Sequence, residues 1–246
     1  MAAFIQSPHY YRGRQRPLRL IVWHDMEVVN GATAAENVAR NFADPNGRKS
    51  SAHVCVDLDS EVECVKLQDT AWHAPGANAD GCGIELAGYA RQSAAEWASP
   101  ASEATLRRAA VWVASKPELR VIPVRFLTDA QLADRKTPGH TTHAQVSRVF
   151  KLSTHTDPGP NFPAAHVLQL VSQALNPPAP PPPVQEDEDM KPIIFDAAGG
   201  QWVLYNGGYH HLPTPRDTEA WARGGAVSAG PISDAEHALL VADAAK

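Results

Sequence analysis

The sequence predicts an α/β fold for residues 1–176, with a mixed central β-sheet flanked by helices. Short apolar runs typical of strands alternate along the chain with longer segments whose apolar residues recur at helical spacing. Such alternation is typical of domains in which helices cover the faces of one sheet. The 246 residues are 43% apolar and 20% charged, an ordinary globular composition. We therefore expect one α/β domain followed by a smaller unit.

Four segments carry strand patterns. Residues 18–23 (LRLIVW) form a continuous apolar run with β-branched members, which predicts a strand buried on both faces. Residues 51–57 and 61–67 alternate apolar and polar side chains around the turn 58–60, which predicts a β-hairpin. Residues 83–87 (GIELA) predict a further strand.

Three segments predict helices. Thr33 is placed to cap the first of them, with Glu36 three residues on as the partner in a capping box, and the turn 44–47 ends it. Residues 103–114 and 164–174 show apolar side chains at helical spacing.

Composition excludes several classes of protein. With 22 Lys and Arg against 27 Asp and Glu, the chain lacks the basic excess of a general nucleic-acid binder. No apolar window approaches the length that spans a bilayer, so we expect no membrane insertion. No signal-peptide pattern is visible, so we expect the protein to be made in the host cytoplasm. Cys55, Cys64 and Cys82 lack CxxC spacing and are predicted to be buried thiols.

The chain divides at a proline-rich, acidic segment. Residues 177–190 contain six prolines within seven residues and then four consecutive acids, which predicts an extended linker. Residues 1–176 carry 18 basic and 17 acidic side chains, whereas residues 177–246 carry 4 and 10. We therefore expect a domain over 1–176, a linker over 177–190 and a small, acidic second unit over 191–246.

The sequence of the second unit predicts a small α+β domain. Glycine pairs separate three short strand-like runs, and two segments with helical patterns follow. The predicted strands are 193–195, 201–205 and 209–212, and the predicted helices are 217–222 and 233–244.

Histidine is the residue that points to chemistry in the first domain. His24 follows the first buried strand, where ligands gather in α/β folds. His143 and Asp157 lie in the segment 139–163, which we expect to be rich in loops. Two imidazoles and one carboxylate are sufficient to bind Zn²⁺ and leave a fourth position for water.

Five motifs carry a resemblance to a known family: WHDME, SSAHVCVD, TAWHAPGAN, GIELAGYA and the pair THAQVS and THTDPGPNFP. They occur in the same order as in zinc-dependent N-acetylmuramoyl-L-alanine amidases, which are related to peptidoglycan-recognition proteins, and most closely resemble the amidase domains of phage endolysins directed at actinobacterial walls. The resemblance covers roughly residues 17–175. The resemblance implies a hydrolase that cleaves the amide bond between N-acetylmuramic acid and the L-alanine of bacterial peptidoglycan.

The resemblance also implies a set of zinc ligands. His24 corresponds to the first ligand and Asp157 to the third. For the second, His143 and His140 compete: the valine after His143 and its distance from Asp157 favour His143, while the preceding glycine favours His140. The expected ligands are therefore His24, His143 and Asp157, with His140 left open.

Two further residues are implied to take part in catalysis. Glu85 resembles the acid that orients or deprotonates the zinc-bound water, and a lone glutamate in an apolar strand is costly unless a charge or metal compensates it. His155 stands where relatives carry a lysine or histidine that stabilises the tetrahedral oxyanion.

Four residues are expected at the substrate pocket. For His53 and His73, core packing or hydrogen bonding to a ligand is weighed equally with substrate contact. Trp72 is expected mainly to form a wall of the pocket, and Asn78 of the TAWHAPGAN motif to bind substrate.

Two alternatives stay open. A family member that loses a zinc ligand becomes a non-catalytic peptidoglycan-recognition module, but here the His/His/Asp set and Glu85 are complete. The second unit resembles the cell-wall-binding part of an endolysin, although its acidity is at odds with an anionic wall, and a protein-contact or dimerisation module is the alternative. Release to the wall by a separate holin is the expected route. The sequence leaves the oligomeric state open.

Overall fold

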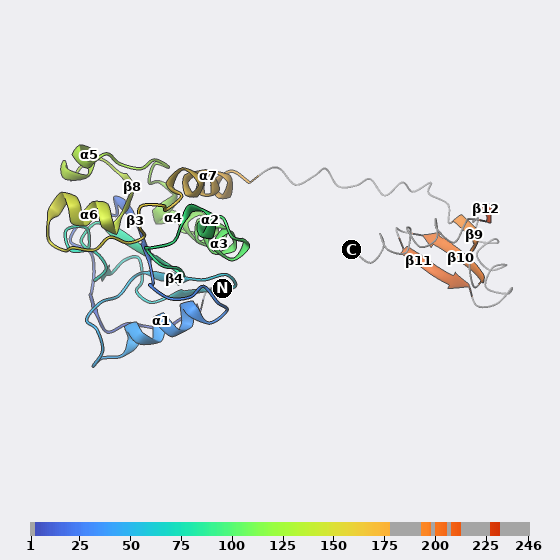
Figure 1. The fold of residues 1–246 in the computed structure, drawn as a ribbon, viewed down its shortest axis with the longest axis horizontal. Coiled ribbons are helices and arrows are strands. Elements are labelled where there is room, and N and C mark those ends of the chain that lie inside the picture. Colours follow the sequence, from blue (N-terminus) through green and yellow to red (C-terminus); the bar gives the residue numbers. More distant parts are fainter. Residues whose placement is uncertain (1–2, 178–192, 198–199, 206–207, 213–226, 232–246) are drawn as a thin grey trace. The chain divides into compact units, whose positions relative to one another are not determined.

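The computed structural model describes residues 3–177, 193–197, 200–205, 208–212 and 227–231 (Figure 1). The chain divides into two compact units, Met1–Pro178 and Ala179–Lys246. Each unit is considered by itself.

A six-stranded mixed sheet forms the centre of the first unit. Its spatial order is β1-β5-β4-β7-β3-β8. The strands are β1 (Ala3–Phe4), β3 (Leu20–Asp25), β4 (Val54–Val56), β5 (Glu61–Glu63), β7 (Gly81–Leu86) and β8 (Gly139–Thr142). Strand β3 pairs in parallel with both β7 and β8, whereas β4 and β5 form the predicted antiparallel hairpin. The predicted mixed sheet is therefore confirmed, and its central strand β3 is buried along its whole length.

Helices cover both faces of this sheet (Figure 1). Ile21 and Trp23 of β3 pack with α3 and α7, while Leu20 and Val22 pack with α5 and α6. On this second face, α1 covers the β4–β5 hairpin. The helices are α1 (Ala34–Ala43), α2 (Ala94–Trp97), α3 (Pro100–Ser115), α4 (Pro117–Arg120), α5 (Asp129–Ala133), α6 (His143–Phe150) and α7 (Ala164–Leu175). In the part of the chain that the structure describes, none of them is long and apolar enough to cross a bilayer.

Residues 139–163, expected to be rich in loops, contain strand β8 and helix α6. Thr142 ends the strand and caps the helix, because its hydroxyl accepts a hydrogen bond from the Gln145 N–H at 3.1 Å. Two short strands that the sequence did not predict, β2 (Tyr10–Tyr11) and β6 (Thr70–Ala71), form a small separate sheet.

The three cysteines are free and buried, as predicted. The Cys55 and Cys64 sulfurs lie 3.8 Å apart beneath α1, and Cys82 lies on β7. They pack as small apolar side chains in the core.

The cap of helix α1 differs from the predicted capping box. Thr33 is the N-cap residue, but its hydroxyl makes no capping hydrogen bond. Instead the buried Asp57 carboxylate accepts the Ala35 N–H at 2.9 Å, and it also accepts the Ser60 N–H of the hairpin turn at 2.8 Å. Burial acts to raise the pKa of Asp57, but these hydrogen bonds prevail and lower it. One carboxylate therefore fixes both the hairpin turn and the start of the helix.

The described part of the second unit is a four-stranded sheet of order β11-β10-β9-β12. Its strands are β9 (Ile193–Ala197), β10 (Gly200–Tyr205), β11 (Gly208–Leu212) and β12 (Val227–Pro231). The three predicted strands are found, and β12, which pairs in parallel with β9, was not predicted. The predicted helices over 217–222 and 233–244 lie outside the described residues, as does nearly all of the predicted linker.

The Asp57→Ala variant is expected to lower the free energy of unfolding by about 1–3 kcal/mol, because it leaves buried N–H groups without an acceptor. Thr33→Ala, the matched control, should change it by no more than about 0.5 kcal/mol. The native pKa of Asp57 is lowered, so its contribution is present at neutral pH and is lost on acidification. Urea unfolding at pH 7 and at acidic pH measures both effects. Equal losses from the two variants at pH 7 would contradict this assignment of the cap.

Candidate active site

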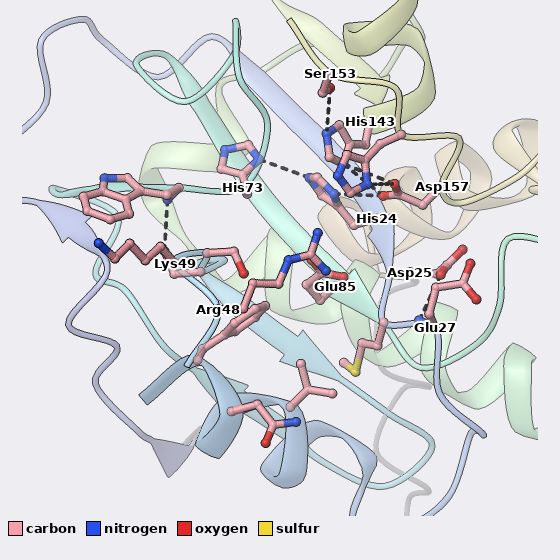
Figure 2. A pocket seen from close by; sticks show the side chains of 18 of the residues that line it. His24, Asp25, Glu27, Arg48, Lys49, His73, Glu85, His143, Ser153 and Asp157 are labelled. Carbon is pink, nitrogen blue, oxygen red and sulfur yellow. Dashed lines mark hydrogen bonds and ion pairs between the residues drawn. The ribbon is translucent and has the colours of Figure 1, made fainter. Parts of the chain in front are cut away.

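The expected site residues meet on one face of the sheet, between α1 and α6. His24 of β3 pairs in register with Glu85 of β7, so both side chains project from the same face. His143 is the first residue of α6, directly after β8, and Asp157 lies in the loop that follows α6. Figure 2 shows His24, His143 and Asp157 converging beside Glu85. The site thus lies outside the carboxyl ends of parallel strands, as is usual in α/β folds.

Two imidazoles share the Asp157 carboxylate. Asp157 Oδ2 lies 3.0 Å from His24 Nδ1 and 3.2 Å from His143 Nδ1. One ligand atom from each of these buried residues can be chosen so that all three atoms lie within 4.8 Å of one another. Two imidazole nitrogens and a carboxylate oxygen in one small cluster fit a catalytic zinc site, which keeps a further position for water or substrate.

The protonation states of the cluster also fit a metal. Burial acts to raise the pKa of Asp157, but hydrogen bonds from His143 and His24 prevail and hold it well below its usual value. Burial lowers the pKa of His24 despite the neighbouring carboxylate. At neutral pH the cluster therefore offers an ionised carboxylate and a neutral His24 imidazole, the forms that bind metal ions.

His140, the rival for the second ligand position, lies outside this cluster. Its side chain is fully buried, and its Nδ1 accepts a hydrogen bond from the Trp23 indole N–H at 3.1 Å. Burial lowers its pKa to about 4. His140 points into the core from β8, whereas His143 begins the next helix, so the geometry places His143 in the cluster.

A pocket of about 820 Å³ opens over the cluster. Glu85 lines it, with one carboxylate oxygen, Oε2, enclosed and without a hydrogen-bond partner. Burial raises the pKa of Glu85 well above its usual value, and the charges of Asp157 and Asp25 add to the shift. A carboxylate with a raised pKa is a stronger base than an ordinary one, which suits proton transfer near neutral pH.

His155 stands at the rim of the pocket. Its ring stacks on that of His143 with the centroids 4.3 Å apart, and its Nδ1 lies 3.3 Å from Asp157 Oδ1. Partial burial and the neighbouring His143 lower its pKa. The side chain is 42% exposed, so substrate in the pocket can reach it.

His73 and Trp72 both line the pocket, from the loop between β6 and β7. His73 Nδ1 lies 3.1 Å from His24 Nε2, and burial lowers the pKa of His73 well below its usual value. The Trp72 ring forms a wall, with the exposed Tyr11 ring at a centroid distance of 5.1 Å. The hydrogen bond to an expected ligand, one of the roles weighed for His73, is present, and its place in the pocket lining is compatible with substrate contact as well.

His53 and Asn78 do not line the pocket, so the core role weighed for His53 is the one found, and the expected contact of Asn78 with substrate is corrected. His53 is fully buried, and its Nδ1 accepts the Gly83 N–H at 3.0 Å. Asn78 Oδ1 accepts the N–H groups of His73 and Ala74 at 3.0 and 2.7 Å. Both side chains act inside the fold, on strand β7 and on the loop that carries His73.

Charged residues that sequence reasoning did not place at the site also line the pocket. Asp25 and Glu27 follow His24, and Arg48 and Lys49 belong to the loop between α1 and β4 (Figure 2). Asp25 and Glu27 stand within the WHDME motif, so their closeness to His24 was an available signal. The Arg48–Lys49 pair has no comparable local signal, because only the fold brings that loop to the cluster.

One of the solved structures compared shares this fold, and two others show a weaker similarity. The hydrolase AmiA of Staphylococcus aureus, solved with its ligand, matches with a TM-score of 0.52 at 15% identity, over 71% of this chain and 83% of AmiA. An AmpD derivative has a TM-score of 0.49 at 22% identity, over 69% of this chain and 94% of that one. The endolysin LysCS of Clostridium intestinale, an N-acetylmuramoyl-L-alanine amidase, has a TM-score of 0.42 at 13% identity, over 70% and 95%. Comparison with curated protein sequences finds no match.

Sequence comparison with protein families gives a more specific result than the fold. A family model described as N-acetylmuramoyl-L-alanine amidase matches residues 14–160, which is more than half of the chain. The matched range includes the three clustered residues and Glu85. The chain therefore belongs to the N-acetylmuramoyl-L-alanine amidase family.

Proposed function

We propose that this protein is a zinc-dependent peptidoglycan hydrolase that cleaves the amide bond between N-acetylmuramic acid and the L-alanine of the stem peptide. The observation that carries the proposal is the convergence of His24, His143 and Asp157 beside Glu85, in a pocket within the family-matched residues. A peptidoglycan-binding module without activity would not require both a complete ligand set and a free carboxylate.

The residues of the cluster would hold the metal through His24 Nδ1, His143 Nδ1 and an Asp157 oxygen. When bound, zinc supplies a Lewis acid that polarises a carbonyl group and lowers the pKa of water toward neutrality. The ionised Asp157 and the neutral His24 have the charge states that suit this cation, provided that the His24 proton is on Nε2.

Glu85 and His155 take the proton-transfer and charge-stabilising roles. Glu85 accepts a proton from the attacking water and returns it to the leaving L-alanine amine, since its raised pKa allows both steps near neutral pH. His155, exposed at the rim, donates a hydrogen bond to the oxyanion of the tetrahedral intermediate. Each role is worth about 10²–10⁴ in rate.

The two units take different roles in this proposal. Residues 1–176 form the catalytic domain, 177–190 the linker and 191–246 a small domain that binds the cell wall. A second contact with an insoluble polymer raises the effective concentration of the catalytic domain at its substrate. The division of the chain into two compact units and the proline run between them support this arrangement.

The resemblance to phage endolysins suggests the biological process in which the protein acts. We place the protein in host lysis, acting on the peptidoglycan wall after a holin releases it from the cytoplasm. The sequence motifs support this role.

Glu85→Gln should lower hydrolysis at least about 100-fold, because the amide cannot accept the proton. Zinc content should be unchanged, since Glu85 is not in the ligand cluster. Mass spectrometry of digested peptidoglycan, which detects a free lactyl carboxyl and a new alanine amine, measures the activity. Glu118→Gln, in the exposed first turn of α4, is the matched control. Wild-type release of muropeptides by Glu85→Gln would remove Glu85 from the mechanism.

His143→Ala should lose bound zinc and activity, whereas His140→Ala should keep its zinc. The reason is that only His143 offers a nitrogen to the cluster. Elemental analysis of the purified variants measures the metal, and circular dichroism checks that both are folded. A folded His140→Ala chain without zinc would show that the ligands are assigned incorrectly.

A chain that ends at Asn176 should cleave soluble muropeptides at the rate of the full chain. Its binding to purified walls should weaken by about 100-fold, because the second contact is gone. Co-sedimentation with walls and turbidity assays of lysis provide the two readouts. Equal binding and lysis by both chains would exclude a wall-targeting role for residues 191–246 and leave the protein-contact alternative.

A further inference from the structure

His73 is a buried residue to which the proposed reaction assigns no role. Its Nδ1 lies 3.1 Å from His24 Nε2, and the two rings meet nearly at right angles, with 83° between their planes. The other nitrogen of His24, Nδ1, faces Asp157 at 3.0 Å. Figure 2 shows His73 on the side of His24 away from Asp157. His24 is therefore held between an aspartate on one side and a histidine on the other.

The position of the His24 proton decides what this contact does. A neutral imidazole carries one N–H and one lone pair. For His24 to offer the Nδ1 lone pair to a cation in the cluster, its proton must be on Nε2. His24 Nε2–H then donates to His73 Nδ1, so His73 acts as the acceptor.

The loop around His73 is built to hold this ring in place. Asn78 Oδ1 accepts the backbone N–H groups of His73 and Ala74 at 3.0 and 2.7 Å. A Cβ atom at position 83 of β7 would lie 2.5 Å from His73 Cγ, so a glycine is needed at this position to leave room for the His73 ring. His73 is 7% exposed, and its orientation is set by these neighbours.

The two ring nitrogens of His73 differ in their contacts. His73 Nε2 is enclosed and has no hydrogen-bond partner among the described residues. His73 satisfies the nitrogen that faces His24.

We propose that His73 is a positioning residue that fixes the tautomer and orientation of His24, so that His24 Nδ1 is presented to a divalent cation. The inference rests on the proposed function, which assigns His24 to the metal. Hydrogen-bond partners of this kind typically contribute about 10- to 100-fold to metal affinity.

Three substitutions of His73 distinguish the effect of its hydrogen-bond acceptor from the effect of the size of its ring. His73→Phe keeps a ring but removes the acceptor. His73→Asn places an amide oxygen near the position of Nδ1, whereas His73→Gln places it one carbon further out. The dissociation constant for zinc, measured by competition with a chromophoric chelator, is the readout and needs no turnover. We expect His73→Phe and His73→Gln to bind zinc about 10- to 100-fold more weakly and His73→Asn to recover most of that loss.

His140→Phe is the matched control, because His140 is an equally buried histidine that hydrogen-bonds Trp23 instead of a ligand. Its zinc affinity should equal that of the wild type. Thermal unfolding of the metal-free variants identifies any that fail to fold, and the His73→Asn and His73→Gln pair provides the comparison if the phenylalanine variant is lost. Wild-type affinity in His73→Gln, or equal losses in His73→Asn and His73→Gln, would overturn the inference. A wild-type chain that binds no zinc would instead contradict the proposed function itself.

Discussion

The parallel pairing of β3 with β7 and β8 is the constraint on which the rest of the site depends. It sets His24 beside Glu85 in the same register and brings the start of α6 to the same edge of the sheet. A shift of one residue in this register would turn one of the two side chains into the opposite core. The apolar packing of β3 on both faces therefore does more than stabilise the domain, because it fixes the spacing of the reactive groups.

The Asp157 carboxylate provides a hydrogen-bond partner for two histidines that this packing buries. Two histidines held in a partly closed pocket would each be costly without hydrogen-bond partners. The Asp157 carboxylate contacts both His24 and His143, while His73 contacts the far nitrogen of His24. The side chains of the cluster are thus held in place by the fold and by one another.

Much of the fold and of the site could be predicted from the sequence, and the exceptions share a cause. The buried strand, the hairpin and the main helices follow from local periodicity, and His24 and Glu85 stand out by their place in apolar strands. His143 was favoured as the ligand but His140 stayed open, because the two lie on either side of an unpredicted change from strand to helix. The cap of α1 comes from the distant Asp57, and the burial of His53 comes from packing between strands, so neither has a local signal.

The dual role of Asp57 has a consequence for how the pocket moves. Helix α1 leads into the loop that carries Arg48 and Lys49, so the hairpin, the helix and one rim of the pocket are tied together through one carboxylate. Segments tied in this way open and close as a cooperative unit instead of fraying independently. Fluctuations that admit a bulky polymer on this side would thus involve the β4–β5 hairpin as well as the loop, so the rigidity of its turn would affect how the enzyme admits its substrate.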